Sequence, residues 1–265
     1  MKDTQLKAYR RDGWMGGAID YHERVGSTNE LALRAGKAGA PAGLLVLAEE
    51  QTAGRGRLDR RWHAPAGQCL LMSLLFRPGP PFARRAARIT MLCGLALAES
   101  AAEIAGIEVQ LKWPNDLIVA REDGVWRKIA GMLSEIGGAA QQPALLVVGL
   151  GLNVNVPATV LADLAPNAGS LRAEIGHPVD RVALLDDFLA RLEAAYARWD
   201  SGWDPLRTWE ARLAWIGQTV SIHTPDAIHT GQAVGVDEEG ALLLRQPDGS
   251  RRAFPVGDVS LRPPD

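Results

Sequence analysis

Segment 51–62 reads QTAGRGRLDRRW and concentrates positive charge in a chain of 265 residues whose formal net charge is only -2. We call it the arginine loop; its charged residues are one carboxylate, Asp59, and four arginines, Arg55, Arg57, Arg60 and Arg61. Glycines between the arginines let backbone N–H groups approach a ligand, and each guanidinium matches carboxylate or phosphate oxygens in a bidentate way. The loop therefore favours binding of a nucleotide or an acyl phosphate. Taken alone, a solvated charged loop is an equal alternative, because charge runs usually face water.

A second cluster, Lys112-Trp113-Pro114-Asn115-Asp116, has the composition of a turn after a strand. Lysine at a strand end suits phosphate oxygens, and a following carboxylate suits Mg²⁺, which prefers carboxylate and phosphate ligands. Lys112 is therefore a candidate phosphate ligand, and Asp116 a candidate magnesium ligand. The alternative is an ordinary turn stabilised by its Asn and Asp side chains.

Two further segments place polar residues beside small ones. Lys128 precedes Ile129-Ala130-Gly131, where a substrate can pack against the backbone, although a lone lysine there is usually a surface residue with a buried stem. Segment 149–155, GLGLNVN, ends a very apolar run, and its asparagines suit either a purine edge or a structural turn. The chain has no GxxxxGK[ST], GxSxG or HExxH motif, and its five histidines lack metal-ligand spacing. A zinc site and a Rossmann cofactor are therefore not expected.

Apolar patterns predict the elements that position these residues. Ser27 to Glu30 has capping-box spacing and opens a helix. Residues 83–104, rich in alanine and leucine, predict a long helix, and Asp180 caps another with an apolar stripe at spacings of three and four. Strands are predicted at 44–48, 69–76, 109–112, 117–120, 129–136 and 145–156. Helix and sheet are therefore mixed.

After Trp215 the sequence changes to short β-like segments separated by turns such as EEG and PDG. About 50 residues of this kind predict a small β-barrel or SH3-like module. We expect two domains, residues 1–214 and residues 215–265.

Composition indicates a globular protein, with 47% apolar and 23% charged residues. Cys69 and Cys93 lie in apolar surroundings, so we expect buried thiols and a reducing compartment. No signal peptide follows the basic start, and no segment approaches the roughly 18 apolar residues of a membrane span. We expect a cytoplasmic protein without membrane association.

Five segments in this order and at these separations resemble the biotin protein ligase family: STNE, EEQTAGRGRLDRRW, LKWPNDL, KIAGMLSE and GLGLNVN. The resemblance covers about residues 20–160, and the sequence from Trp215 onward is similar to that family's C-terminal β-domain. It implies an α+β fold: a mixed β-sheet catalytic domain flanked by helices, of the class II synthetase-like biotin/lipoate ligase type, with a small C-terminal SH3-like β-barrel.

The resemblance implies an enzyme that activates biotin with ATP and Mg²⁺ to biotinyl-5′-adenylate and transfers the biotinyl group to a lysine of a biotin carboxyl carrier domain. Arg57 and Lys128 would be catalytic, with Arg57 on the phosphate and Lys128 on the reacting carboxylate and acyl phosphate. The residues that would bind biotin are Ser27, Thr28, Asn29, Gln51, Gly54, Arg55, Gly56, Arg57, Lys128 and Gly131. Those that would bind ATP or the adenylate are Arg57, Arg60, Trp62, Lys112, Asn115, Gly149 and Asn153, with Trp62 stacked on adenine and Asp116 on Mg²⁺.

The sequence departs from the family pattern at two places. Asp59 stands where the family loop usually has glycine, and we expect it to repel ATP or to pair with Arg57 or Arg60, weakening ATP binding without abolishing activity. Fewer than about 30 residues precede STNE, so the single-function form without an N-terminal DNA-binding domain is expected. The pI of 6.2 agrees in predicting no DNA binding, and a homodimer is left open.

Three alternatives compete with this interpretation. A lipoate- or octanoate-transferring ligase would share the fold, although its loop and KWPND patterns would differ. A nucleic-acid-binding module would use the arginine loop as a basic arm, yet interleaved aromatic residues and an overall basic balance are lacking. A non-catalytic biotin or adenylate sensor is the third, and it would not need Lys128.

Overall fold

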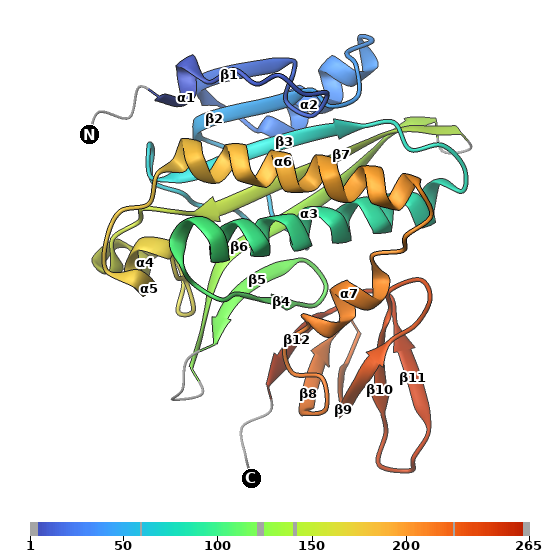
Figure 1. The fold of residues 1–265 in the computed structure, drawn as a ribbon. Coiled ribbons are helices and arrows are strands. Elements are labelled where there is room, and N and C mark those ends of the chain that lie inside the picture. Colours follow the sequence, from blue (N-terminus) through green and yellow to red (C-terminus); the bar gives the residue numbers. More distant parts are fainter. Residues whose placement is uncertain (1–4, 59, 121–124, 140–141, 225, 262–265) are drawn as a thin grey trace.

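A computed structural model describes residues 5–58, 60–120, 125–139, 142–224 and 226–261. Its centre is a seven-stranded sheet in the order β1-β2-β3-β7-β6-β5-β4 (Figure 1). Strands β1 and β2 are parallel and the other neighbours are antiparallel. The bounds are β1 Ile19–Val25, β2 Leu45–Gln51, β3 Cys69–Phe76, β4 Gln110–Lys112, β5 Asp116–Ala120, β6 Trp126–Ala139 and β7 Gln142–Asn153.

The two faces of the sheet bury different residues of the same strand. Leu45 and Leu47 of β2 join the large core under helices α3 (Phe82–Ala105) and α6 (Arg181–Asp200), which lie side by side in Figure 1. Val46 instead packs with helix α2 (Thr28–Lys37) in a separate cluster. Because successive strand residues point to opposite faces, α2 covers the face opposite to α3 and α6. The mixed sheet flanked by helices is thus confirmed.

Local signals explain most element boundaries, with one correction. Asp180 caps α6 as predicted, since its carboxylate accepts from the N–H groups of Val182 and Ala183. Ser27 is the N-cap of α2, but its side chain makes no capping hydrogen bond, and Glu30 instead pairs with Arg34. The predicted capping box is therefore wrong as a hydrogen-bond pattern, although the helix begins where it was expected. Shorter helices are α1 Gln5–Ala8, α4 Ala158–Leu164, α5 Leu171–Ile175 and α7 Leu206–Ala211.

The C-terminal part forms a second, antiparallel sheet in the order β11-β10-β9-β8-β12. Its strands are β8 Thr219–His223, β9 Ile228–Val236, β10 Leu242–Arg245, β11 Arg251–Phe254 and β12 Asp258–Leu261. The fully buried Arg88 of α3 donates to Asp204 and to the Glu238 carbonyl, and the Trp113 indole donates to the Gly240 carbonyl at 3.0 Å. These contacts dock the small sheet so that the start of β12 reaches the large domain.

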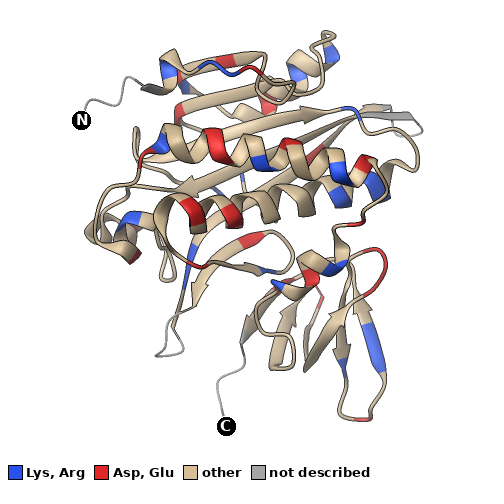
Figure 2. Cartoon of the chain, viewed as in Figure 1, with Lys and Arg blue, Asp and Glu red and all other residues tan. Residues whose placement is uncertain are grey.

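The thiols are buried, as the sequence predicted, and the helices carry charges of both signs. Acidic and basic residues both occur along α6 (Figure 2), where Arg191 pairs with Asp187 and with Glu99 of α3. Cys69 and Cys93 are buried and unbridged, and burial raises the pKa of the Cys69 thiol to about 12. In the part of the chain that is described, no helix is both long and apolar enough to cross a membrane.

Candidate active site

A cavity of about 380 Å³ collects the sequence-predicted residues on the sheet face that carries α2. Its walls come from the end of β2, the arginine loop, the start of α2, the turn between β4 and β5, strands β6 and β7, and the first residue of β12. All predicted site residues line it except Gly54. A Cβ at Gly54 would lie 2.5 Å from the Trp62 carbonyl oxygen, so this glycine closes the base of the loop, and it lines a neighbouring cavity instead.

One end of the cavity is lined by uncharged polar residues, and we call it the neutral end: Ser27, Thr28, Asn29 and Gln51, with the fully buried Ser73 behind them. The Thr28 N–H donates to Gln51 Oε1 at 2.8 Å, and Thr28 Oγ1 lies 3.2 Å from the same oxygen. Ser73 Oγ lies 2.8 Å from Thr28 Oγ1. No hydrogen bond joins the Ser27 hydroxyl or the Gln51 amide nitrogen to another described residue. This end therefore offers neutral donors and acceptors to a small polar head group.

Asn29 supports this end instead of facing a ligand freely. Its amide nitrogen donates to the Leu133 carbonyl at 3.1 Å and to Glu135 Oε2 at 2.7 Å, while its oxygen accepts from Ser73. A Cβ on Gly149 would lie 2.0 Å from that oxygen, so Gly149 makes room for Asn29. The two residues therefore shape the wall of the neutral end, and their contacts with biotin and with the nucleotide stay predictions.

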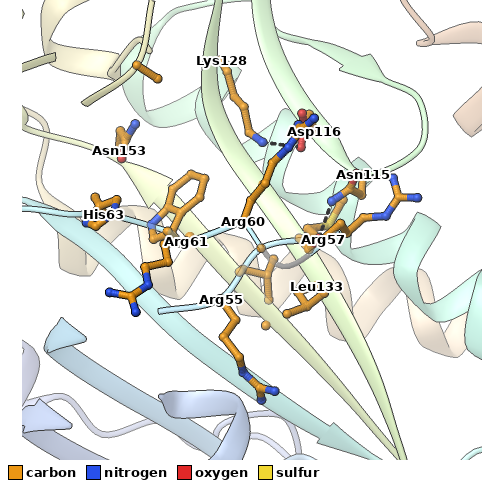
Figure 3. Close-up of a pocket in the computed structure, with 18 of the residues that line it drawn as sticks. Arg55, Arg57, Arg60, Arg61, His63, Asn115, Asp116, Lys128, Leu133 and Asn153 are labelled. Atoms are coloured by element: carbon orange, nitrogen blue, oxygen red, sulfur yellow. Dashed lines mark hydrogen bonds and ion pairs between the residues drawn. The ribbon is translucent and has the colours of Figure 1, made fainter. Parts of the chain in front are cut away.

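The opposite end, which we call the charged end, is a chain of alternating charges made by Lys128, Asp116, Lys112, Asp258 and Arg60. Lys128 Nζ lies 2.7 Å from Asp116 (Figure 3), and Lys112 Nζ lies 3.8 Å from Asp116. Lys112 also lies 2.7 Å from Asp258, which pairs with Arg60 at 2.7 Å. Burial alone would raise the pKa of Asp258, but Lys112 and Arg60 outweigh it and lower the pKa to about 2.

The arginine loop folds back on itself as a narrow hairpin. Trp62 N donates to Gly54 O at 3.0 Å, and Gly56 N donates to Arg60 O at 2.7 Å. Arg57 donates to Asn115 Oδ1, as Figure 3 shows, and to the Gly257 carbonyl, both at 3.2 Å. Burial is the main cause of its lowered pKa. Asp59 lies outside the described residues, so its pairing with Arg57 or Arg60 stays a prediction. In the structure Arg57 contacts Asn115 and Gly257, and Arg60 pairs with Asp258.

Trp62, the last residue of the arginine loop, packs on strands β6 and β7 through Gly131 and Gly151. A Cβ on Gly151 would lie 2.5 Å from Trp62 Cε2, so the indole ring rests directly on that glycine. Lys128 Nζ lies 5.6 Å from the ring centroid, within the range of a cation–π contact. Asn153 donates to the Gly169 carbonyl at 2.9 Å and lies at the same side of the cavity. This side is the one expected to hold adenine.

Among the residues missed from the sequence, three hold the geometry of the site. Ser73 is the one polar residue of the buried run CLLMSLLF, a signal that could have identified it. Glu135 accepts from both Asn29 and Arg55, and Asp258 reaches the cavity from β12. Glu135 ends the KIAGMLSE segment, but no local pattern assigns a role to it or to Asp258, because their partners lie far away in the sequence.

Comparisons with known proteins agree with this geometry. Residues 21–153 match the biotin/lipoate A/B protein ligase family, and residues 215–262 match the biotin protein ligase C terminal domain. The chain belongs to the biotin/lipoate A/B protein ligase family. A biotin--[acetyl-CoA-carboxylase] ligase of Paracoccus denitrificans is 35% identical, over 89% of this chain and 97% of that protein.

Other members of the family are similarly close. The bifunctional ligase/repressor BirA of Bacillus subtilis (strain 168) is 33% identical over 98% of this chain and 79% of its own length. The biotin protein ligase from Aquifex aeolicus in complex with biotin and ATP has a TM-score of 0.74 at 26% identity, covering 92% of this chain and 98% of that one. The predicted family and fold are confirmed.

Proposed function

We propose that this protein is an ATP-dependent biotin protein ligase. The carboxylate of biotin attacks the α-phosphorus of ATP, which forms biotinyl-5′-adenylate and releases pyrophosphate. A lysine amine of a biotin carboxyl carrier domain then attacks the acyl carbon, which forms an amide and releases AMP. The observation that carries the proposal is a single cavity joining a neutral hydrogen-bonding end to a lysine- and arginine-lined end.

The neutral end favours biotin over lipoate or octanoate. A ureido ring presents N–H donors and a carbonyl to Ser27, Thr28 and Gln51, whereas an octanoyl chain or a dithiolane presents none. Leaving a buried donor or acceptor without a partner costs about 1–3 kcal/mol, and sites built for a hydrogen-bonding substrate reject analogues that lack those groups strongly. The match to a biotin protein ligase C-terminal domain also favours biotin.

The charged end suits the chemistry of the phosphate. As charge develops on the acyl phosphate, Lys128 can approach from Asp116 and Arg57 from Asn115, because both side chains already line the cavity. One contact at 4 Å and an effective dielectric near 20 is worth about 4 kcal/mol before desolvation. Its loss would slow adenylate formation by roughly 10²- to 10³-fold. Lys112 and Arg60 would hold further phosphate oxygens.

Magnesium fits this end as an ion carried by ATP. The Asp116 carboxylate is bracketed by two lysines, and the described residues contain no cluster of three His, Cys, Asp or Glu side chains suited to a metal. Mg²⁺ commonly uses one or two carboxylates and fills its other positions with water and phosphates. Asp116 would be its protein ligand, and the ion would neutralise phosphate charge.

Strand β6 has a free edge beside the cavity, and this edge suits an acceptor domain. Strand β5 pairs with β6 only as far as Gly131, and Met132 N then donates to the Asn115 carbonyl. Residues 133–135 line the neighbouring cavity of about 790 Å³ between the arginine loop and α3. Because extended segments add to exposed strands, we infer that the lysine-bearing segment of a carrier domain pairs along this edge.

The cysteines bear on the compartment of the protein. Free, buried Cys69 and Cys93 suit a reducing compartment, so we place the protein in the cytoplasm.

A second copy of the chain is the competing occupant of the β6 edge. Sedimentation with and without a carrier domain distinguishes a carrier complex from a homodimer.

Biotin-dependent ATP–pyrophosphate exchange tests the proposed function. We expect exchange with biotin, little with lipoate or octanoate, and transfer to one lysine of an added biotin carboxyl carrier domain detected by mass spectrometry. Exchange with lipoate in place of biotin would support the lipoate ligase instead, and biotin binding without exchange would support a sensor.

A further inference from the structure

Glu135 lines the neighbouring cavity and links the neutral end to the arginine loop through one carboxylate oxygen. Its Oε2 accepts from the Asn29 amide at 2.7 Å and from the Arg55 guanidinium at 2.8 Å. Asn29 belongs to the first turn of α2, and Arg55 belongs to the arginine loop. The carboxylate therefore fastens the loop to the wall of the neutral end.

The fastening continues into the core of the protein. Ser73 is fully buried in β3 and donates to Asn29, whose amide nitrogen is held by Glu135 and by the Leu133 carbonyl. At the other end the contact is breakable, because the side chains of Glu135 and Arg55 are 22% and 48% exposed. A rigid anchor thus ends in an ion pair that water and salt can reach.

The other contacts of the loop lead to the charged end. Arg57 donates to Asn115 and Gly257, and Arg60 pairs with Asp258. Among the described residues beyond Gln51, the Arg55–Glu135 pair is the only side-chain contact that ties the loop to a residue bonded to the neutral end. Removing it would leave the bonded arginine side chains of the loop held at the charged end alone.

We propose that Glu135 is a positioning residue that couples occupancy of the neutral end to closure of the arginine loop. The identity of the ligand at that end, biotin, rests on the proposed function. A ligand bound to Thr28 and Gln51 holds the first turn of α2, and Asn29 then holds the Glu135 carboxylate where Arg55 can reach it. Because the coupling is reciprocal, a closed loop also slows escape of the ligand.

Limited trypsin digestion reads loop closure directly, since the loop carries four arginines. We expect Glu135→Gln to be cut after Arg55–Arg61 about two- to fivefold faster than wild type, the range for a partly exposed ion pair. Biotin should protect the wild-type loop more than the variant. Glu135→Asp should restore part of the protection. Glu30→Gln, which removes an exposed pair with Arg34 outside both cavities, should match wild type.

Equal cutting of wild type and Glu135→Gln without ligand would overturn the proposal, as would equal protection by biotin. Faster cutting at sites throughout the chain, with a lower melting temperature, would also overturn it, because it would show a structural role. The ligand-free arm requires no catalysis, so an inactive wild type would defeat the proposed function while leaving this contact testable. In an active enzyme, Glu135→Gln should also release biotinyl-5′-adenylate faster, measured by rapid dilution.

Discussion

The neutral and charged ends of the cavity solve recognition in opposite ways. At the neutral end, Ser27, Thr28 and Asn29 are each 5% exposed or less, and Thr28 and Asn29 bond to neighbouring protein groups. At the charged end, Lys128 and Arg60 side chains are 33% and 67% exposed, Lys112 between them is 5% exposed, and all three are matched by carboxylates. One end is preassembled from neutral groups, and the other holds ion pairs that a ligand can replace.

This difference separates binding from chemistry. Neutral hydrogen bonds in a buried wall discriminate by shape and are insensitive to salt, because unmatched groups there cost the full desolvation penalty. Exposed ion pairs contribute little to stability but can transfer their charge to a substrate. Substitutions at the neutral end should therefore change the KM for biotin, whereas those at the charged end should change the rate or the retention of the adenylate.

The largest effect is expected from Lys128→Met. Losing the ammonium group should lower the rate of adenylate formation by about 10²- to 10³-fold with little change in the KM for biotin. Biotin-dependent pyrophosphate exchange measures both parameters. Lys37→Met, on the exposed end of α2, is the matched control and should behave as wild type. An unchanged rate in Lys128→Met would remove this lysine from the chemistry.

Thr28→Val should weaken the recognition of biotin at the neutral end. Valine keeps the shape but removes the hydroxyl between Ser73 and Gln51, so the KM for biotin should rise about tenfold or more while kcat changes little. Thr52→Val removes a hydroxyl that donates to the Val25 carbonyl at an exposed position, and serves as the control. A fall in kcat at constant KM would contradict the division between the two ends.

Arg57→Gly tests the loop beside the charged end, because it removes the side chain that donates to Asn115 and Gly257. The variant should still form the adenylate but retain it less well. Biotinylation of bystander lysines on an added, unrelated protein should rise about tenfold. Adding Lys128→Met to the same chain should abolish that labelling, and no bystander labelling in the single variant would argue against a retaining role for Arg57.

Asp258→Asn should have the smallest effect, on stability and its pH dependence. The pKa of Asp258 is lowered to about 2, so its ion pairs stabilise the folded state above the unfolded pKa near 4 and are lost as pH falls toward 2. With partial exposure taken into account, we expect about 1 kcal/mol at neutral pH.

Thermal unfolding of Asp258→Asn and wild type between pH 2 and 7 checks this sign. The melting temperatures should differ at pH 7 and converge near pH 2. Asp163→Asn, an exposed residue of α4, is the control. A difference that grows at acidic pH would contradict the assigned ion pairs.

The sequence predicts the fold best where burial is continuous. The run of β3 is buried along its whole length and was predicted with its observed bounds, because both of its faces are covered. Strand β1, IDYHERV, was missed since its residues are polar and only half-buried at the edge of the sheet. Strand β12 was missed as well, because it is short and follows the proline and glycine of a turn.

The chemical character of the site was more predictable from the sequence than the contacts that set its geometry. The glycine and arginine content of the arginine loop and the lysines at 112 and 128 indicated an anion site before any fold was known. The partners that set their geometry, Glu135 for Arg55 and Asp258 for Lys112, lie 80 and 146 residues away in the sequence. Only the sheet and the docking of the small domain bring them together.

A crystal structure of the protein with biotinyl-5′-adenylate tests the two-ended cavity most directly. We expect the ureido ring against Thr28 and Gln51, the phosphoryl group within hydrogen-bonding distance of Lys128 and Arg57, and adenine on the Trp62 side. A compound bound in the reverse direction, or in the neighbouring cavity with Lys128 still paired only to Asp116, would contradict it.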